Sequence, residues 1–252
     1  MNVENWYHSG SHLCPLKRRF ITEHQKGQPM PLRGRAFVSL WSGLLKGYER
    51  ELDRWHTIEH MPERLGVPGF LRGRRYMDSK ASDHAMFILY EAAHIDTFRS
   101  PGLIARLNDP TDWSKRVQPG LVNFIRAPCR TLVSLGEGVG GALMAIRVFG
   151  EIGDKIEAGH SLVNAAPTIL RMHGVTAIHI GQHAPDSIET AETKLRPTTS
   201  PVNIHFVVLI EGIGVSELEN VANSVADKVT EASAGSCEAG VYRLAYLLDS
   251  VG

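Results

Sequence analysis

Residues 51–76 read ELDRWHTIEHMPERLGVPGFLRGRRY, and the rest of the chain can be interpreted outward from this stretch. Its first part predicts a helix over residues 46–65. Pro68 and Gly69 then form a turn, because proline and glycine interrupt regular structure. Residues 70–77 follow as a β-strand. A helix, a tight turn and a strand are therefore expected in direct succession.

The same order of elements occurs twice along the chain. Each copy runs strand, helix, strand, strand, helix, strand, which is the ferredoxin-like βαββαβ arrangement with both helices on one face of an antiparallel sheet. The first copy is expected at residues 36–41, 46–65, 70–77, 85–91, 100–117 and 121–126, and the second at residues 142–149, 154–172, 175–182, 202–211, 216–232 and 241–248. The fold class is therefore predicted to be α+β, with two tandem repeats that bury their bare sheet faces against each other.

An offset of 105 residues brings the copies into register, so that His60-Met61-Pro62 falls on Ala165-Ala166-Pro167. We divide the chain into a poorly ordered N-terminal tail (1–33), a first, motif-bearing repeat (34–133), a Gly-rich linker (134–141) and a second, degenerate repeat (142–252). Met30 directly precedes the first predicted strand, and a translation start there is one hypothesis for the tail. The copies diverge at residues 184–201, a polar loop longer than its counterpart.

The composition is that of a soluble protein with a packed core. The 252 residues include 27 basic and 27 acidic side chains, and 43% are hydrophobic. Without a basic excess, neither a nucleic acid nor a membrane surface is expected as a partner. No apolar run reaches the roughly 18 residues that a bilayer requires and no signal-peptide pattern is present, so the expected location is cytoplasmic. The three cysteines lack C-x-x-C spacing and are expected to be free thiols.

The clearest predicted element is the helix over residues 216–232. Ser216 and Glu219 have the spacing of a capping box, in which each side chain satisfies a backbone N–H of the first turn. An apolar stripe through Leu218 and Val225 must then pack on a sheet.

Residues 136–141 contain the pattern G-x-G-x-x-G. In dinucleotide-binding folds this pattern follows a strand and opens a helix. Because residues 142–149 are predicted to be a strand, we interpret the segment as a linker between the repeats. No organic cofactor is expected.

The densest polar cluster lies within residues 55–64. On a helix, His56 and His60 share a face and Glu59 lies alongside, which matches the zinc-peptidase pattern H-x-x-E-H. Pro62 places this pattern at a helix end, and no third ligand stands out in the sequence. A zinc hydrolase is therefore the least favoured alternative, and no metal site is expected.

The stretch 51–76 resembles the dimeric α/β-barrel superfamily, specifically its EthD-like branch, through Trp55, the run E-H-x-P-E-R, the P-G-F turn and the Arg-rich strand ending in Tyr76. Residues 107–113, LNDPTDW, are similar to a second segment of related sequences. The resemblance covers residues 36–126 well and implies an intramolecular dimeric α/β barrel with a small-molecule pocket between helix and sheet. It leaves isomerase, cyclase, lyase and monooxygenase chemistry open.

His60 and Glu59 are the candidate catalytic residues. His60 is expected at the C-terminal end of a helix, where the helix dipole favours the protonated imidazole. An imidazole poised near neutral pH can give and take a proton without a cofactor. The alternative is a histidine that only caps the last carbonyls of the helix.

Residues expected to bind substrate flank this pair on the helix and on the next strand. Strand alternation places Arg72, Arg74, Tyr76 and Phe70 on one face of the sheet. A buried arginine needs an anion, either a substrate carboxylate or enolate or a protein carboxylate such as Glu91. The expected substrate-binding set is Trp55, His56, Arg64, Arg72, Arg74 and Tyr76.

The second copy lacks these residues, because His56, Glu59 and His60 align with Ser161, Asn164 and Ala165. A single site is therefore expected, with the second repeat as a permanent partner and further homo-oligomerisation possible. The favoured function is a cofactor-free enzyme acting on a small organic molecule, with an aromatic compound or a keto acid as the candidate substrate. The alternative is a non-catalytic binding or structural protein.

Overall fold

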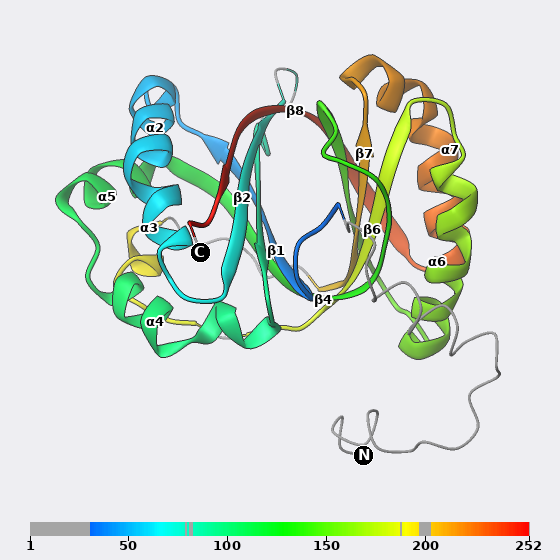
Figure 1. The fold of residues 1–252 in the computed structure, drawn as a ribbon, viewed down its shortest axis with the longest axis horizontal. Helices are drawn as coiled ribbons and strands as arrows, with labels where there is room; N and C mark the ends of the chain where they lie inside the picture. The colour runs from blue at the N-terminus through cyan, green and yellow to red at the C-terminus, as the bar shows by residue number, and fades with distance from the viewer. Residues whose placement is uncertain (1–30, 79, 81–82, 187, 197–202, 252) are drawn as a thin grey trace. The chain divides into compact units, whose positions relative to one another are not determined.

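Eight antiparallel strands close into a barrel in the computed structural model, which describes residues 31–251 except 79, 81–82, 187 and 197–202 (Figure 1). The strand order around the barrel is β1-β3-β2-β8-β5-β7-β6-β4. The predicted α+β class with two sheets packed face to face is confirmed. Most of the predicted tail lies outside the described residues.

The first half contributes one four-stranded sheet and the helices that cover its outer face. Its strands are β1 (Ala36–Leu44), β2 (Phe70–Met77), β3 (Met86–Ala92) and β4 (Leu121–Gly136). Its helical segments are α2 (Glu49–Trp55), the π-helix η2 (His56–His60), α3 (Met61–Leu65), η3 (Ile95–Arg99), α4 (Pro101–Asn108), α5 (Asp112–Val117) and η4 (Gln118–Gly120).

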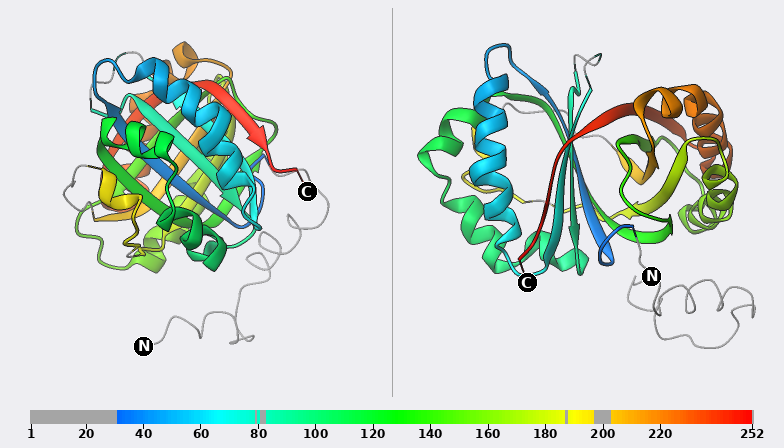
Figure 2. Two further views of the ribbon diagram at one scale, coloured as in Figure 1. Left: turned by 90° about the vertical axis from the view of Figure 1, so that its left-hand side faces the viewer. Right: turned by 45° about the horizontal axis from the view of Figure 1, so that its top comes forward.

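The second half repeats this plan with two longer helices. Its elements are β5 (Ala142–Phe149), α6 (Lys155–Leu170), β6 (Val175–His183), the short η5 (Thr193–Leu195), β7 (Ile204–Gly212), α7 (Val215–Ser233) and β8 (Ser236–Asp249). Figure 2 shows the two groups of helices on opposite sides of the barrel. No helix among the described residues is long and apolar enough to cross a membrane.

Two long strands join the halves. The first part of β4 pairs with β1, and its last part, from Cys129 to Gly136, pairs with β6 of the second half. In the same way β8 pairs first with β5 and then, from Arg243 to Asp249, with β2 of the first half. The predicted strands 121–126 and 241–248 cover only part of each: the end of β4 that pairs with β6 and the start of β8 that pairs with β5 were missed.

The hydrophobic core has three layers, and the alternation of each strand assigns its residues to them. One layer lies between the first sheet and its helices, and a second lies between the second sheet and α6 and α7. The third fills the barrel and contains Phe37, Trp41, Tyr76 and Leu209. Leu32, which was assigned to the tail, is fully buried in this third layer.

The start of α7 differs from the predicted capping box. The N-cap is Gly214, no side chain caps the helix, and Ser216 lies inside its first turn. Glu219 instead forms an ion pair with Lys80. The helix begins at Val215, one residue earlier than predicted. Ser216 therefore does not occupy the N-cap position, and the pair Ser216 and Glu219 does not cap the backbone N–H groups of the first turn.

The Gly-rich segment connects two strands. β4 ends at Gly136 and β5 begins at Ala142, so no helix follows the glycines. Gly136 has a φ of 103°, and a Cβ there would lie 2.2 Å from the carbonyl oxygen of Thr176. The glycine is required by this close approach of two backbones.

Candidate functional site

The polar cluster predicted from the sequence lies on a π-helix, η2, between α2 and α3. Pro62 explains the wider turn, because proline lacks the N–H that would bond the carbonyl four residues earlier and its ring crowds that carbonyl. The N–H of Met61 bonds the carbonyl of His56, five residues back. Single π-turns are rare and occur frequently at functional sites.

The wider turn brings the rings of Trp55, His56 and His60 close together. The indole of Trp55 lies 4.2 Å from the imidazole of His60 between ring centroids, with an interplanar angle of 33°. The His56 and His60 rings are 5.5 Å apart. Both histidines are buried, with 1% and 7% of their surface exposed.

Burial makes both histidines neutral. It lowers the pKa of His60 well below 6.5, and the nearby charges of Arg64, His56 and Arg196 lower it further. The pKa of His56 is lowered by burial and by Arg75 and Arg64. The expected protonated His60 is therefore wrong. The helical path continues to Leu65 instead of ending at His60, and the dominant effect is desolvation rather than a helix dipole.

Glu59 points away from His60. Its carboxylate accepts a hydrogen bond of 2.6 Å from the hydroxyl of Thr111 and one of 3.4 Å from that of Ser114. Ser114 in turn accepts a hydrogen bond of 3.1 Å from the indole N–H of Trp55. Glu59 thus ties α5 to the helix and holds the Trp55 ring against His60.

Arg64 lies one turn after His60 and is part of a buried ion network. It pairs with Glu63 at 3.2 Å and with Glu192, which is 2% exposed. Glu192 also accepts a hydrogen bond of 2.8 Å from Arg196, and Arg196 donates one of 2.6 Å to Gln118. Glu192 and Arg196 come from the second half, so this half contributes directly to the network.

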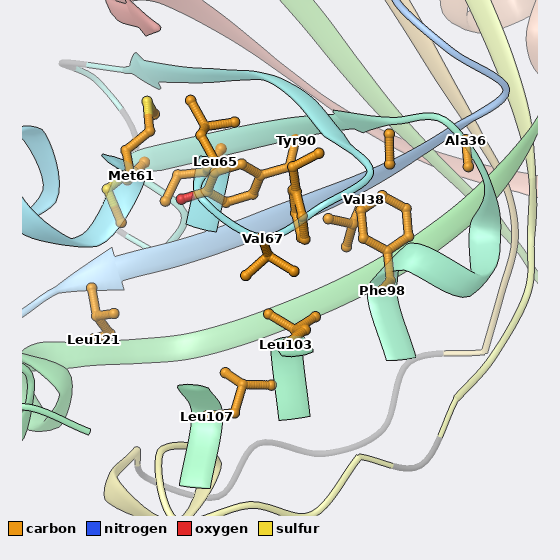
Figure 3. Close-up of a cluster of buried hydrophobic side chains, with 14 of the residues drawn as sticks. Ala36, Val38, Met61, Leu65, Val67, Tyr90, Phe98, Leu103, Leu107 and Leu121 are labelled. Atoms are coloured by element: carbon orange, nitrogen blue, oxygen red, sulfur yellow. The ribbon is translucent and has the colours of Figure 1, made fainter. Parts of the chain in front are cut away.

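Strand β3 places a tyrosine in the same layer. Tyr90 is buried, and desolvation raises its pKa although Arg64 opposes the effect. Figure 3 shows its ring among the apolar side chains of this layer, which include Met61 and Leu65. Gly73 on β2 makes room for this packing, because a Cβ there would lie 2.9 Å from Met61 and 3.1 Å from Tyr90.

Several buried polar atoms of this layer have no hydrogen-bond partner among the described residues. Most buried polar groups in proteins are paired, so such atoms require an explanation. They are both ring nitrogens of His56, Nδ1 of His60, Nε2 of Gln118, the hydroxyl of Tyr90 and, apart from its ion pair with Glu63, Nη1 of Arg64. We call this group, with Trp55, Glu192 and Arg196, the His60 site.

Three predicted substrate-binding residues lie elsewhere. Arg74 and Tyr76 point into the barrel, on the face of β2 opposite the His60 site. Arg72 lies near the start of the same strand and donates a hydrogen bond of 2.7 Å to Asp249. Phe70 does not share their face, since it packs in the helix-covered layer, and the register shifts between Phe70 and Arg72.

The barrel interior holds a second ion network around Arg74. This fully buried guanidinium pairs with Glu91 at 2.7 Å and with Glu211 at 2.6 Å. Glu211 also contacts Nε2 of His179 at 3.0 Å, and Nδ1 of His179 lies 2.9 Å from the hydroxyl of Ser134. Burial alone would raise the pKa of Glu211, but Arg74 and His179 outweigh burial and lower it to about 2.

The two halves contribute equivalent positions to this network. Arg74 lies opposite Leu89 in the first sheet, and His179 lies opposite Leu209 in the second. Glu91 and Glu211 are each the second-to-last residue of an apolar strand. Glu91 was one candidate partner for a buried arginine in the sequence, whereas Glu211 was missed, although the matching strand position was a signal for it.

The zinc alternative has no support from the geometry. Glu59 is bound to Thr111 and Ser114, so the three residues of the H-x-x-E-H pattern do not converge. Among the described residues, no group of three or more histidine, cysteine or acidic side chains could hold a metal ion.

Neither of two surface hollows in the described part of the chain is lined by His56 or His60. One, of about 520 Å³, lies beside Pro68 and residues 94–101. The other, of about 410 Å³, opens at the end of the barrel next to Trp41, Arg147 and Tyr242. The side chains of the His60 site are packed, so a ligand there must displace some of them.

No protein-family model and no curated protein matches the sequence. Solved structures are similar in fold. An anthrone oxidase-like protein matches with a TM-score of 0.58 and 9% identity, over 85% of this chain and 92% of its own. A candidate monooxygenase from Fusobacterium nucleatum matches with a TM-score of 0.54 and 11% identity, over 88% and 97% of the two chains.

The fold is that of the dimeric α/β barrels. A chlorite dismutase variant from Candidatus Nitrospira defluvii also has this fold, with a TM-score of 0.51, 10% identity and coverage of 85% of this chain and 92% of its own. At these identities the likeness concerns the dimeric α/β barrel alone.

Proposed function

We propose that this dimeric α/β barrel is a small-molecule enzyme that uses His60 as a general base, without a cofactor. The observation that carries the proposal is that three ring nitrogens of the buried, neutral His56 and His60 and the hydroxyl of Tyr90 have no hydrogen-bond partner in the described part of the chain. Unpaired buried polar groups are costly unless a ligand or a reaction uses them.

The chemistry that fits these groups is proton transfer next to a carbonyl. A nitrogen of neutral His60 takes a proton from the carbon beside the carbonyl. The electron pair of that C–H bond forms a C=C bond to the carbonyl carbon, and the π pair of the C=O bond moves to the oxygen to give an enolate. The hydroxyl of Tyr90 donates a hydrogen bond to this oxygen and so stabilises its negative charge. Because the imidazolium is buried beside Arg64, it returns the proton readily, as in an isomerisation.

The charges of the site favour an uncharged substrate. Arg64 and Arg196 are balanced by Glu63 and Glu192, so no guanidinium is left over for a carboxylate. Arg72 and Arg74 are likewise paired with protein carboxylates. We therefore favour a neutral ketone or phenol over the keto acid that the sequence also allowed.

Further observations support the enzyme function, the EthD-like branch and an origin by tandem fusion. One structural neighbour is named as an anthrone oxidase-like protein and another as a candidate monooxygenase, which supports an enzyme that acts on small molecules. The motif of residues 59–64 favours the EthD-like branch, and the equivalent register of Arg74 and His179 favours a tandem fusion.

One observation favours the non-catalytic alternative. The His60 site is packed and both surface hollows lie elsewhere, as they would if the helix motif served only to hold the layer together.

Deuterium exchange separates the two functions. The neutral ketone 2-tetralone is incubated with the protein in D₂O, and loss of its α-proton signal is followed by proton NMR. We expect exchange about 100-fold faster than in buffer, the lower range for general-base catalysis, and loss of this acceleration in His60→Gln. His173→Gln, which alters an exposed histidine, should leave the rate unchanged. Equal rates with and without protein, or in His60→Gln and the parent, would overturn the proposal.

A further inference from the structure

We infer that Glu192, which the second half places in the His60 site of the first half, is the residue that excludes anionic ligands from that site. The inference rests on the proposed function, since it concerns ligand choice at the same site. It assigns a specific role to the loop after β6, which the sequence marked only as a long insertion.

The described residues that follow β6, 184–186 and 188–196, lead to the helices of the first half, where Figure 1 shows the later part in yellow beside α3 and α4. The backbone N–H of Glu192 donates a hydrogen bond of 2.9 Å to the carbonyl of Leu107 on α4. The N–H of Ala191 donates one of 3.2 Å to the side chain of Asn108. Main-chain bonds to α4 thus fix the position of Glu192.

Further contacts hold both ends of the crossing segment. At its start, Asp186 forms an ion pair with Arg126. At its end, the guanidinium of Arg196 lies 4.0 Å from the centroid of the Phe124 ring. Ile188 packs against the core layer that contains the His60 site. These residues therefore form one side of the His60 site.

The opposite loop in the other half makes a much weaker contact. Between β2 and β3, Lys80 reaches α7 and pairs with Glu219, but 71% and 40% of these side chains are exposed. An exposed pair contributes little to stability or to the local potential. Arg64 and Glu192, by contrast, are 6% and 2% exposed. The two halves therefore differ in whether the loop delivers a buried charge.

The buried location gives Glu192 its effect on ligands. Arg64 and Arg196 both depend on its carboxylate, and the only other acidic partner of Arg64 is Glu63 among the described residues. If Glu192 loses its charge, the site carries an excess positive charge in surroundings of low dielectric. An anionic ligand would then neutralise the guanidinium groups in its place.

Calorimetric titration of Glu192→Gln with 2-naphthoate tests the inference. We expect this anion to bind about tenfold or more tightly to the variant than to the parent protein, in line with a gained charge-assisted contact. Histidine-ring NMR should show that it binds beside His60. Two controls on the same segment or side chain are Glu189→Gln, at an exposed position, and Glu192→Asp, which keeps the charge. Neither should gain affinity, and an equal gain in Glu189→Gln or no gain in Glu192→Gln would overturn the inference.

A variant of opposite charge decides the question if Glu192→Gln does not fold. Arg64→Gln leaves the site with excess negative charge, so it should gain affinity for 2-naphthylmethylammonium while Glu189→Gln does not. No gain would contradict the inference. The proposed function is judged separately, because deuterium exchange into 2-tetralone by the parent protein does not depend on either result.

Discussion

Arg74 shows how a single side chain depends on both halves of the barrel. Its guanidinium is fully buried and pairs with one carboxylate from each half, Glu91 and Glu211. Strand alternation and the need for an anion left Glu91 as one candidate partner beside a substrate anion. The pairing with Glu211 was not predicted, because only closure of the barrel brings β7 close to β2, although Glu211 has the same place in its strand as Glu91.

We predict that Glu211→Gln lowers the free energy of unfolding by about 3–5 kcal/mol, the typical cost of removing one partner of a buried ion pair. Urea denaturation followed by circular dichroism measures it. Glu238→Gln is the matched control, because Glu238 also pairs with an arginine but is 61% exposed, so its loss should cost less than about 1 kcal/mol. Equal effects of the two variants would contradict the importance of the buried network.

The same carboxylate predicts a loss of stability in acid. The pKa of Glu211 is lowered from 4.5 to about 2 in the folded protein. A lowered pKa means that the folded state favours the ionised carboxylate, so the stabilisation is complete above pH 4.5 and is lost as the pH falls from 4.5 to 2. The free energy of unfolding of the parent protein should therefore fall more steeply over this range than that of Glu211→Gln. Parallel curves would show that Glu211 does not carry the effect.

The His60 site shows the limits of prediction at the residue scale. The helix motif correctly indicated that Trp55, His56 and Arg64 lie near His60. It did not indicate Tyr90, Gln118 or Glu192, because these come from other elements that the motif does not describe. The direction of the His60 pKa was also missed, since burial cannot be read from helix position.

At the scale of elements, Pro62 and the glycines of the linker act through the backbone. Pro62 converts one turn of the helix into a π-turn and so rotates the two histidines toward the sheet layer. A sequence pattern with helical spacing predicts a regular helix and cannot reveal this change.

The turn after β4 was predictable from its glycines, but the exact ends of β4 and β5 depend on contacts with β6 and β7.

Two alanine substitutions in the linker should differ in cost. Gly136 and Gly138 both have positive φ, but a Cβ at Gly138 meets no atom within 4 Å, whereas one at Gly136 would lie 2.2 Å from the Thr176 carbonyl oxygen. We expect Gly138→Ala to cost roughly 1–2 kcal/mol from backbone strain alone. Gly136→Ala should cost about 3 kcal/mol or more, because overpacking adds to the strain. Thermal unfolding measures both, and similar costs would contradict the close approach at Gly136.

At the scale of the whole molecule, the chain is a symmetric barrel with an asymmetric site. The repeated order of strands and helices made the barrel predictable, and the aligned positions of Arg74 and His179 preserve the relation between the halves. The contact of residues 188–196 with the first half was not predictable, because an irregular polar loop carries no sequence signal for the element it will contact. The two halves therefore differ in whether they receive a buried charged residue from the other half.

The central claim is one site per chain, built around a neutral, buried His60 by both halves. Its most direct test is the ¹⁵N NMR signal of the histidine rings in the full chain, followed from pH 8 downward and then titrated with 2-tetralone. The lowered pKa values of His56 and His60 predict that these rings stay neutral well below the ordinary pKa of 6.5. One equivalent of 2-tetralone should then shift both ring signals to saturation. Protonation of His60 near pH 6.5, saturation at two equivalents, or no response of either ring would contradict the claim.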